Sequence, residues 1–125
     1  MFNPVLNKID YHPNITTIKS FYNHPEFIEA YANIIQPVLD QHDVDVILFS
    51  YHGLPVRHIE KVHCQHLNKH CQDSKPCPIV TQQNQHCYRA QCYATTRAII
   101  KKLQLEPSQY RNAFQSRLGR TPWIQ

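Results

Sequence analysis

The chain has 125 residues, of which 42% are hydrophobic and 10% aromatic, so its length suits one folded domain and excludes a multidomain protein. Thirteen Lys and Arg against nine Asp and Glu give a formal charge of +4, but the basic residues are scattered and we expect no nucleic-acid partner. No apolar run approaches the roughly 18 residues that a membrane-spanning helix needs. The first residues lack the apolar core of a signal peptide, so we expect the protein in the cytoplasm.

The N-terminal part of the sequence predicts a short strand followed by a helix. Ile15–Ser20 is rich in β-branched residues and predicts the strand. Pro25 suits the first turn of the helix, and Pro37 is expected to kink its last turn before a boundary at residues 41–43. The buried face of this helix is predicted from apolar residues three or four apart, which are Ile28, Tyr31, Ile35 and Leu39.

Val44–Ser50 is a nearly continuous apolar run, too short for a helix and flanked by polar residues. Such a run is typical of a parallel strand that is buried on both faces. It leads directly into Tyr51–Pro55, a turn that contains one glycine and one proline. The sequence therefore places a turn at the carboxyl end of a central strand.

The C-terminal part predicts a helix over Tyr88–Leu103 and a last strand over Tyr110–Gln115. The fold class is therefore α/β, with a partial doubly wound parallel sheet of about three strands and two main helices. Two helices and three strands are too few to cover both faces of such a sheet. The sequence is typical of one part of a larger α/β sheet.

Ligands of open α/β sheets gather at the carboxyl ends of parallel strands, which is where the turn after Val44–Ser50 is predicted. His52 lies in this turn, and imidazole is the side chain that takes up a proton or binds a metal near neutral pH. Gly53 allows close approach of a ligand, and Pro55 stiffens the turn. The alternative is a loop histidine with a structural hydrogen bond only.

Four cysteines stand in a polar stretch of the chain, with a fifth shortly after them. The four are Cys64, Cys71, Cys77 and Cys87. In a cytoplasmic protein this grouping favours metal thiolates over disulfides, and both zinc and an iron–sulfur cluster accept four thiolates. The spacing lacks the paired cysteines of zinc ribbons, which makes a zinc site less favoured but does not exclude it. Nearby histidines could replace a thiolate, namely His63, His66, His70 and His86.

The segment Phe114–Trp123 places one tryptophan and two arginines around Gly119, just after the last predicted strand. Stacking on an aromatic ring and pairing with guanidinium groups would suit a flat anionic ligand. A buried Trp123 beside solvated arginines is the alternative.

Four segments together resemble the ferrochelatases, which insert ferrous iron into a porphyrin to complete haem, and the resemblance is to bacterial members. The segments are Phe21–Pro25, LFSYHGLP at Leu48–Pro55, Tyr88–Cys92 with Thr95 and Thr96 after it, and FQSRLGRTPW at Phe114–Trp123. They occur in the order found in that family, and the resemblance runs from about Ser20 to Trp123. The second and fourth segments are the specific ones.

The resemblance implies a chelatase-like fold and protoporphyrin IX and Fe²⁺ as substrates. It implies that His52 is the metallation histidine, which accepts pyrrole protons and binds the incoming Fe²⁺. It implies that the porphyrin cleft is lined by Tyr51, Gln115, Ser116, Arg117 and Trp123. It leaves peripheral contact with a membrane and the oligomeric state open.

Two departures from the family's pattern stand out. Family members are longer at both ends, and the acidic residue that faces the histidine has no counterpart here, so the activity of the isolated chain stays open. The usual Gly-Asp pair before Tyr88 is replaced by His86 and Cys87, behind an insertion at residues 60–87 of a single partial domain spanning 1–125. Some bacterial relatives bind a [2Fe–2S] cluster, so the resemblance favours Cys64, Cys71, Cys77 and Cys87 as cluster ligands.

Two alternatives belong to other classes of protein. One is a small zinc-binding or iron–sulfur-binding interaction module built on the cysteine-rich loop, without catalysis. The other is a thiol enzyme that uses Cys92 with a histidine base, which requires an exposed thiol of low pKa.

Overall fold

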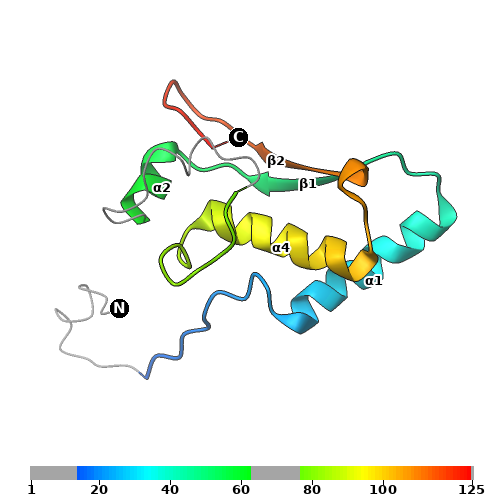
Figure 1. The fold of residues 1–125 in the computed structure, drawn as a ribbon. Coiled ribbons are helices and arrows are strands. Elements are labelled where there is room, and N and C mark those ends of the chain that lie inside the picture. Colours follow the sequence, from blue (N-terminus) through cyan, green and yellow to red (C-terminus); the bar gives the residue numbers. More distant parts are fainter. Residues whose placement is uncertain (1–13, 63–76, 125) are drawn as a thin grey trace.

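The computed structural model describes residues 14–62 and 77–124. Within these residues the chain forms three α-helices, one 3₁₀ helix and two strands (Figure 1). The elements, in chain order, are α1 (Pro25–Gln41), β1 (Ile47–His52), α2 (Val56–Val62), α4 (Tyr88–Leu103), η2 (Pro107–Gln109) and β2 (Tyr110–Gln115).

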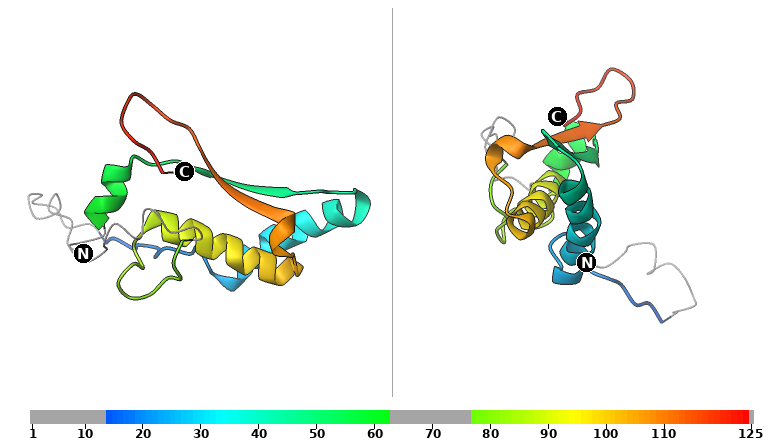
Figure 2. Two further views of the ribbon diagram at one scale, coloured as in Figure 1. Left: turned by 45° about the horizontal axis from the view of Figure 1, so that its top comes forward. Right: turned by 90° about the vertical axis from the view of Figure 1, so that its right-hand side faces the viewer.

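The two strands form a parallel pair whose register runs from Ile47 opposite Tyr110 to His52 opposite Gln115. The long connection between them contains α4, as a parallel crossover requires. Both α1 and α4 lie on the same side of the sheet in every view (Figures 1 and 2). The predicted α/β class and parallel pairing are confirmed, but the described part of the chain covers β1 on one face only.

Burial along β1 alternates because only one face meets helices. Phe49 is buried against the helices, whereas Leu48 on the opposite face is 61% exposed. The prediction of a strand buried on both faces is therefore wrong for the described residues. The strand also begins and ends later than predicted, so Tyr51 and His52 belong to β1 and not to the turn.

Two apolar clusters hold the layers together. The first joins Ile28 of α1, Phe49 of β1 and Ile99 of α4, and it fixes the sheet on the two helices. The second joins Ile59 of α2 and Ile124 to the region before α4, and it fixes the turn after β1. The carboxyl ends of both strands are thus supported from below.

The two long helices, α1 and α4, begin and end as the sequence predicts. Pro25 lies in the first turn of α1, and the helix continues through Pro37 to Gln41. In α4 the side chains of Cys92, Thr95 and Ile99 are buried. An exposed ion pair between Lys102 and Glu29 joins the two helices.

The predicted strand at Ile15–Ser20 does not form, so the sheet of the described residues has two strands and not three. Ile15 and Ile18 are 54% and 86% exposed. β-Branched residues favour a strand only where a neighbouring strand completes the hydrogen bonds, and no strand within residues 14–62 and 77–124 lies beside this segment. Conversely, the sequence does not predict α2, because its seven residues are too few for a helical spacing of apolar residues to be recognised.

Of the predicted insertion at residues 60–87, the part from 63 to 76 lies outside the described residues, including Cys64 and Cys71. No helix among the described segments has the length and apolar character needed to cross a membrane.

Candidate active site at the carboxyl end of the sheet

Gly53 closes the carboxyl end of the two-stranded sheet. Its N–H donates to the carbonyl oxygen of Gln115 at 2.6 Å. A Cβ placed on Gly53 would lie 2.9 Å from the backbone oxygens of both Gln115 and Ser116. Because these are backbone atoms that cannot swing away, a side chain at this position would push the strand ends apart.

The segment after β2 folds back onto this glycine, as Figure 1 shows in red. Trp123 forms an antiparallel bridge with Pro55, and Ile124 N–H donates to Leu54 O at 3.0 Å. The indole Nε1–H donates to Leu118 O at 3.0 Å, which fixes the ring orientation. An edge atom of the indole ring lies 3.4 Å from the position a Gly53 Cβ would take. The half-buried tryptophan is thus held against the residue that follows His52.

His52 is the last residue of β1, and its side chain is exposed. Its Nδ1 lies 2.6 Å from the carbonyl oxygen of Gly53. A carbonyl oxygen can only accept, so Nδ1 must carry the hydrogen, and in the neutral ring Nε2 then carries the lone pair. The backbone carbonyl of His52 in turn accepts a hydrogen bond from Tyr88 Oη at 3.0 Å. Nε2 is therefore the ring atom able to take a proton or bind a metal.

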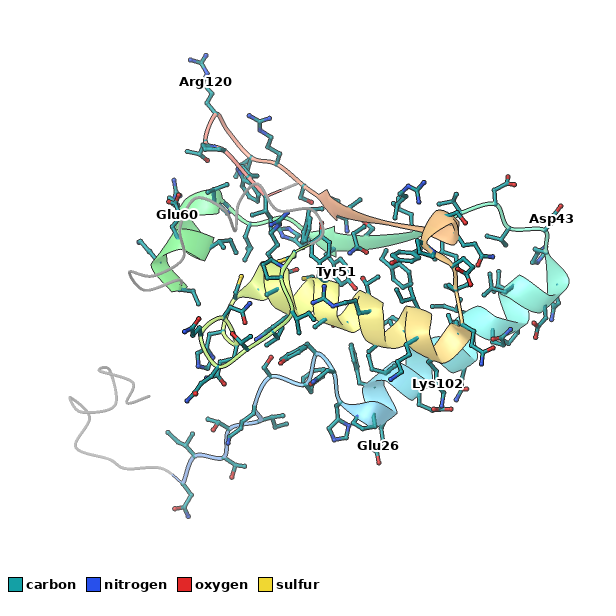
Figure 3. All side chains as sticks on the ribbon, viewed as in Figure 1. Glu26, Asp43, Tyr51, Glu60, Lys102 and Arg120 are labelled. Carbon is teal, nitrogen blue, oxygen red and sulfur yellow. The ribbon has the colours of Figure 1, made fainter. Side chains whose placement is uncertain are left out.

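Tyr51 points to the other side of the strand, between β1 and α4 (Figure 3). Its hydroxyl lies 2.8 Å from Thr96 Oγ1, and Thr96 donates to Asn112 Oδ1 at 2.9 Å. Since Thr96 has one hydrogen and gives it to Asn112, Tyr51 must donate to Thr96. Burial raises the pKa of Tyr51 to about 12, so this hydroxyl stays protonated. The three side chains link β1, α4 and β2 directly beneath the strand ends.

Three other predicted porphyrin-binding residues lie at the end of β2 and directly after it. Gln115, Ser116 and Arg117 are exposed, and Ser116 adopts a positive φ of 70° that turns the chain away from the strand. Arg120 lies at the tip of the loop and points away from the remainder of the molecule (Figure 3). The structure therefore brings His52, Gln115 and Trp123 together around Gly53, and it places Tyr51 on the opposite face of β1.

Two of the predicted cluster ligands lie within the described residues. Cys77 and Cys87 are 2% and 1% exposed and belong to the same apolar cluster. Cys87 is the N-cap of α4, where its sulfur accepts from the Ala90 N–H at 3.5 Å. Among residues 14–62 and 77–124, no three His, Cys, Asp or Glu side chains converge on a metal position. Cys64 and Cys71 lie outside these ranges.

Cys92 is 5% exposed and hydrogen-bonds with Tyr88. Burial raises its pKa to about 11, so the thiol is neutral at physiological pH. A nucleophilic cysteine needs the opposite, a lowered pKa and access to substrate. The arrangement disfavours the thiol-enzyme hypothesis and is that of an ordinary buried thiol.

A hollow of about 740 Å³ lies on the helix side of β1, with side chains of α1 and α4 around it. Its lining includes Phe27, Tyr31, Tyr51 and Cys92, but neither His52 nor Trp123. The candidate chemistry at the strand end is therefore separate from this apolar hollow.

Sequence reasoning did not assign roles to Thr96, Asn112 and the Tyr88 hydroxyl. Thr96 is 1% exposed inside a helix that faces a sheet, a position where a hydroxyl needs a buried partner. The feature of the sequence that could have indicated this role is the pair of adjacent threonines, Thr95 and Thr96, at the centre of the predicted helix.

The fold and site define a parallel α/β protein with an imidazole at the carboxyl end of a strand, where such proteins bind their ligands. The family model described as Ferrochelatase matches residues 2–125, so the chain belongs to the ferrochelatase family. This membership confirms the resemblance seen in the sequence.

Curated relatives give the same family. The chain is 49% identical over 112 residues to a protein named Ferrochelatase from Legionella pneumophila strain Corby, covering 90% of this chain and 32% of the relative. It is 44% identical over 111 residues to the Ferrochelatase of Coxiella burnetii strain Dugway, covering 89% of this chain and 31% of the relative. The chain thus spans about a third of the length of these relatives. No solved structure matches it.

Proposed function

We propose that this chain supplies the proton-accepting wall of a ferrochelatase that inserts Fe²⁺ into protoporphyrin IX during haem synthesis. One observation carries the proposal: the 2.6 Å contact of His52 Nδ1 with Gly53 O, which leaves Nε2 as the basic atom of an exposed ring at a strand end. Family membership supplies the reaction to which such a base belongs.

The chemistry requires a neutral base beside the macrocycle. A free-base porphyrin carries two pyrrole N–H groups, and both protons leave as the divalent metal takes their place. The lone pair on Nε2 accepts one proton at a time and passes it to water, while the Nδ1–H bond holds the ring in the tautomer that can do so. The same lone pair can bind Fe²⁺ before transfer to the porphyrin.

The porphyrin contacts follow from the residues around Gly53. Trp123 offers an indole ring held by the Leu118 carbonyl, which suits stacking on a flat ligand. Gln115, Ser116 and Arg117 continue this wall as exposed polar groups, with Arg117 suited to a propionate. Tyr51 contributes from beneath, because its hydrogen bond to Thr96 fixes the strand that carries His52.

A chimera tests this assignment, with residues of this chain replacing the matched 112 residues of the Legionella ferrochelatase. His52→Ala should lower the rate of metal insertion, followed by porphyrin absorbance, by about 100-fold or more. His58→Ala is the matched control, since this exposed histidine lies on α2, and it should retain the rate within about twofold. Near-normal turnover of His52→Ala would refute the role of His52.

We also propose that Cys64, Cys71, Cys77 and Cys87 bind a [2Fe–2S] cluster. Support comes from Cys77 and Cys87. They are ten positions apart in the sequence, yet both belong to one buried cluster at the start of α4. The N-terminus of a helix favours the thiolate form that a metal requires. The cluster would serve a structural or redox-sensing role, because insertion of ferrous iron needs no electron transfer.

The cluster proposal is tested on protein purified without oxygen. We expect visible thiolate-to-iron absorption and equal amounts of iron and sulfide, both lost in Cys77→Ser and retained in the control Cys92→Ser. A colourless protein with one bound zinc would contradict the cluster and favour the zinc-binding interaction module.

A further inference from the structure

The peptide group between His52 and Gly53 is held at both of its polar atoms. Its N–H, which belongs to Gly53, donates to Gln115 O of β2 at 2.6 Å. Because the C=O and N–H of a trans peptide point in opposite directions, the carbonyl of His52 points to the edge of β1 that faces away from β2. No strand of the described residues pairs with this edge, which we call the open edge. There the hydroxyl of Tyr88 donates to His52 O at 3.0 Å, so a side chain takes the place of a strand N–H.

Tyr88 reaches this carbonyl from a well-supported position. It is the first residue of α4, and its half-buried ring packs against the apolar cluster that contains Ala90 and Ile124. Its hydroxyl also hydrogen-bonds with Cys92, one helical turn further along α4. Since the single hydroxyl hydrogen goes to the His52 carbonyl, which can only accept, the thiol of Cys92 donates to Tyr88. The ring and the hydroxyl of Tyr88 are thus both fixed relative to the end of β1.

This restraint matters because the residue after His52 is a glycine. A glycine backbone has more conformational freedom than any other, so Gly53 alone does not direct its carbonyl toward the imidazole ring. Yet Gly53 O lies 2.6 Å from Nδ1 of His52 and decides which ring nitrogen carries the hydrogen. After Gly53 the backbone is fixed by the bond from Ile124 N–H to Leu54 O at 3.0 Å. The hydrogen bond from Tyr88 fixes the backbone before it, so the glycine lies between two restrained peptide groups.

We propose that Tyr88 is a positioning residue for the proton-accepting histidine: its hydroxyl holds the His52 carbonyl so that Gly53 O takes the Nδ1 hydrogen and Nε2 keeps its lone pair. Tyr88 acts through the backbone of His52 and not by contact with the porphyrin. The inference rests on the proposed function for the identity of the reaction. Its effect on the His52 tautomer, however, is measurable without any porphyrin.

The first test measures the His52 tautomer by long-range ¹H–¹⁵N NMR at a pH where the ring is neutral. It uses the full 125-residue chain and the Legionella chimera. Tyr88→Phe keeps the ring in the apolar cluster and removes only the hydroxyl. It should shift the ratio of the Nδ1–H form to the Nε2–H form by at least about threefold toward Nε2–H, because one hydrogen bond of ordinary strength is lost.

Tyr93→Phe is the matched control for the loss of a tyrosine hydroxyl. This half-buried tyrosine of α4 packs on Phe114 and forms no hydrogen bond with β1, all of whose residues are described. The tautomer ratio should therefore stay within about twofold of the parent. An unchanged ratio in Tyr88→Phe, or an equal change in Tyr93→Phe, overturns the proposal.

The second test measures metal insertion by the chimera. Tyr88→Phe should lower kcat by about 3- to 10-fold, because the ring loses both the tautomer and the orientation that the bond to Gly53 O fixes. KM for the porphyrin should stay within about twofold, since the porphyrin contacts are intact. A raised KM with unchanged kcat would overturn the proposal, because it would make Tyr88 a binding residue.

The two tests separate this inference from the proposed function. If His52→Ala retains turnover while Tyr88→Phe shifts the tautomer, the proposed function fails and the positioning of the ring by Tyr88 stands. If His52→Ala loses turnover while Tyr88→Phe changes neither the tautomer ratio nor kcat, only the role of Tyr88 fails.

Discussion

The two sides of β1 differ in the contacts that this chain makes with them. On the side of β2, contacts within this chain close the strand end around Gly53, with Trp123 behind it and Thr96 beneath it. On the other side, Tyr31 and Ile34 are exposed beside an edge of β1 that pairs with no strand of the described residues. The comparison teaches that the chain supports His52 with its own residues on one side of β1, whereas no strand of the described residues pairs with the other side.

The largest difference between the two sides should appear in unfolding experiments on single apolar residues. Ile99→Ala should lower the free energy of unfolding by about 2–5 kcal/mol, because Ile99 is 2% exposed between the sheet and α4. Ile34→Ala should change it by less than about 0.5 kcal/mol, because Ile34 is 69% exposed. Urea denaturation measures both values. A large loss for Ile34→Ala would show that the open side is already covered.

Gly53→Ala probes the closed strand end. We expect a loss of about 1–3 kcal/mol, because the added Cβ meets two backbone oxygens at 2.9 Å. Gly119→Ala is the comparison, since nothing lies within 4 Å of its Cβ and only its φ of 69° is strained, so about 1 kcal/mol is expected. Thermal unfolding of the two variants decides the order. A smaller loss for Gly53→Ala would contradict the close approach of the strand ends.

Thr96→Val tests the hydrogen-bond chain beneath His52. The change preserves shape but leaves Tyr51 and Asn112 without their shared partner, and we expect a loss of about 1–3 kcal/mol. Tyr51→Phe removes only one end of the chain and should cost about 0.5–1.5 kcal/mol. Chemical denaturation measures both, and equal, negligible losses would argue against a continuous chain.

Alkaline pH should lower the stability of the folded protein more gradually. The pKa of Cys92 rises from 9.0 to about 11 in the folded protein, so above pH 9 the unfolded thiol releases its proton while the folded one keeps it. Stability therefore falls as the pH rises from about 9 to 11, and the raised pKa of Tyr51 extends the fall toward 12. Melting temperatures across this range check the slope. Cys92→Ala should flatten its lower part, and an unchanged slope would exclude Cys92 as its source.

The elements with strong local patterns could be predicted from the sequence. Both long helices and the strand over Tyr110–Gln115 follow from apolar spacing and proline placement, and the specific segments around His52 and Trp123 gave the family. Ile15–Ser20 could not be judged locally, because strand formation depends on a neighbouring strand. The same reason explains why the one-sided burial of Val44–Ser50 was missed.

The candidate site was predictable in its residues but not in its geometry. The turn composition identified His52 and Gly53, but the hydrogen bond that sets the imidazole tautomer depends on the backbone path after β1. The partnership of Tyr51, Thr96 and Asn112 joins three elements far apart in sequence, so no spacing rule could reveal it. The open edge likewise appears only once the strand order is known.

The most direct measurement of the central claim is the protonation state of the two imidazole nitrogens of His52. Long-range ¹H–¹⁵N NMR of histidine-labelled protein, assigned by comparison with His52→Gln, separates them at a pH where the ring is neutral. We predict a hydrogen on Nδ1 and a bare Nε2, as the contact with Gly53 O requires. A hydrogen on Nε2 with a bare Nδ1 would contradict the account, because the exposed nitrogen could then accept no proton from a porphyrin.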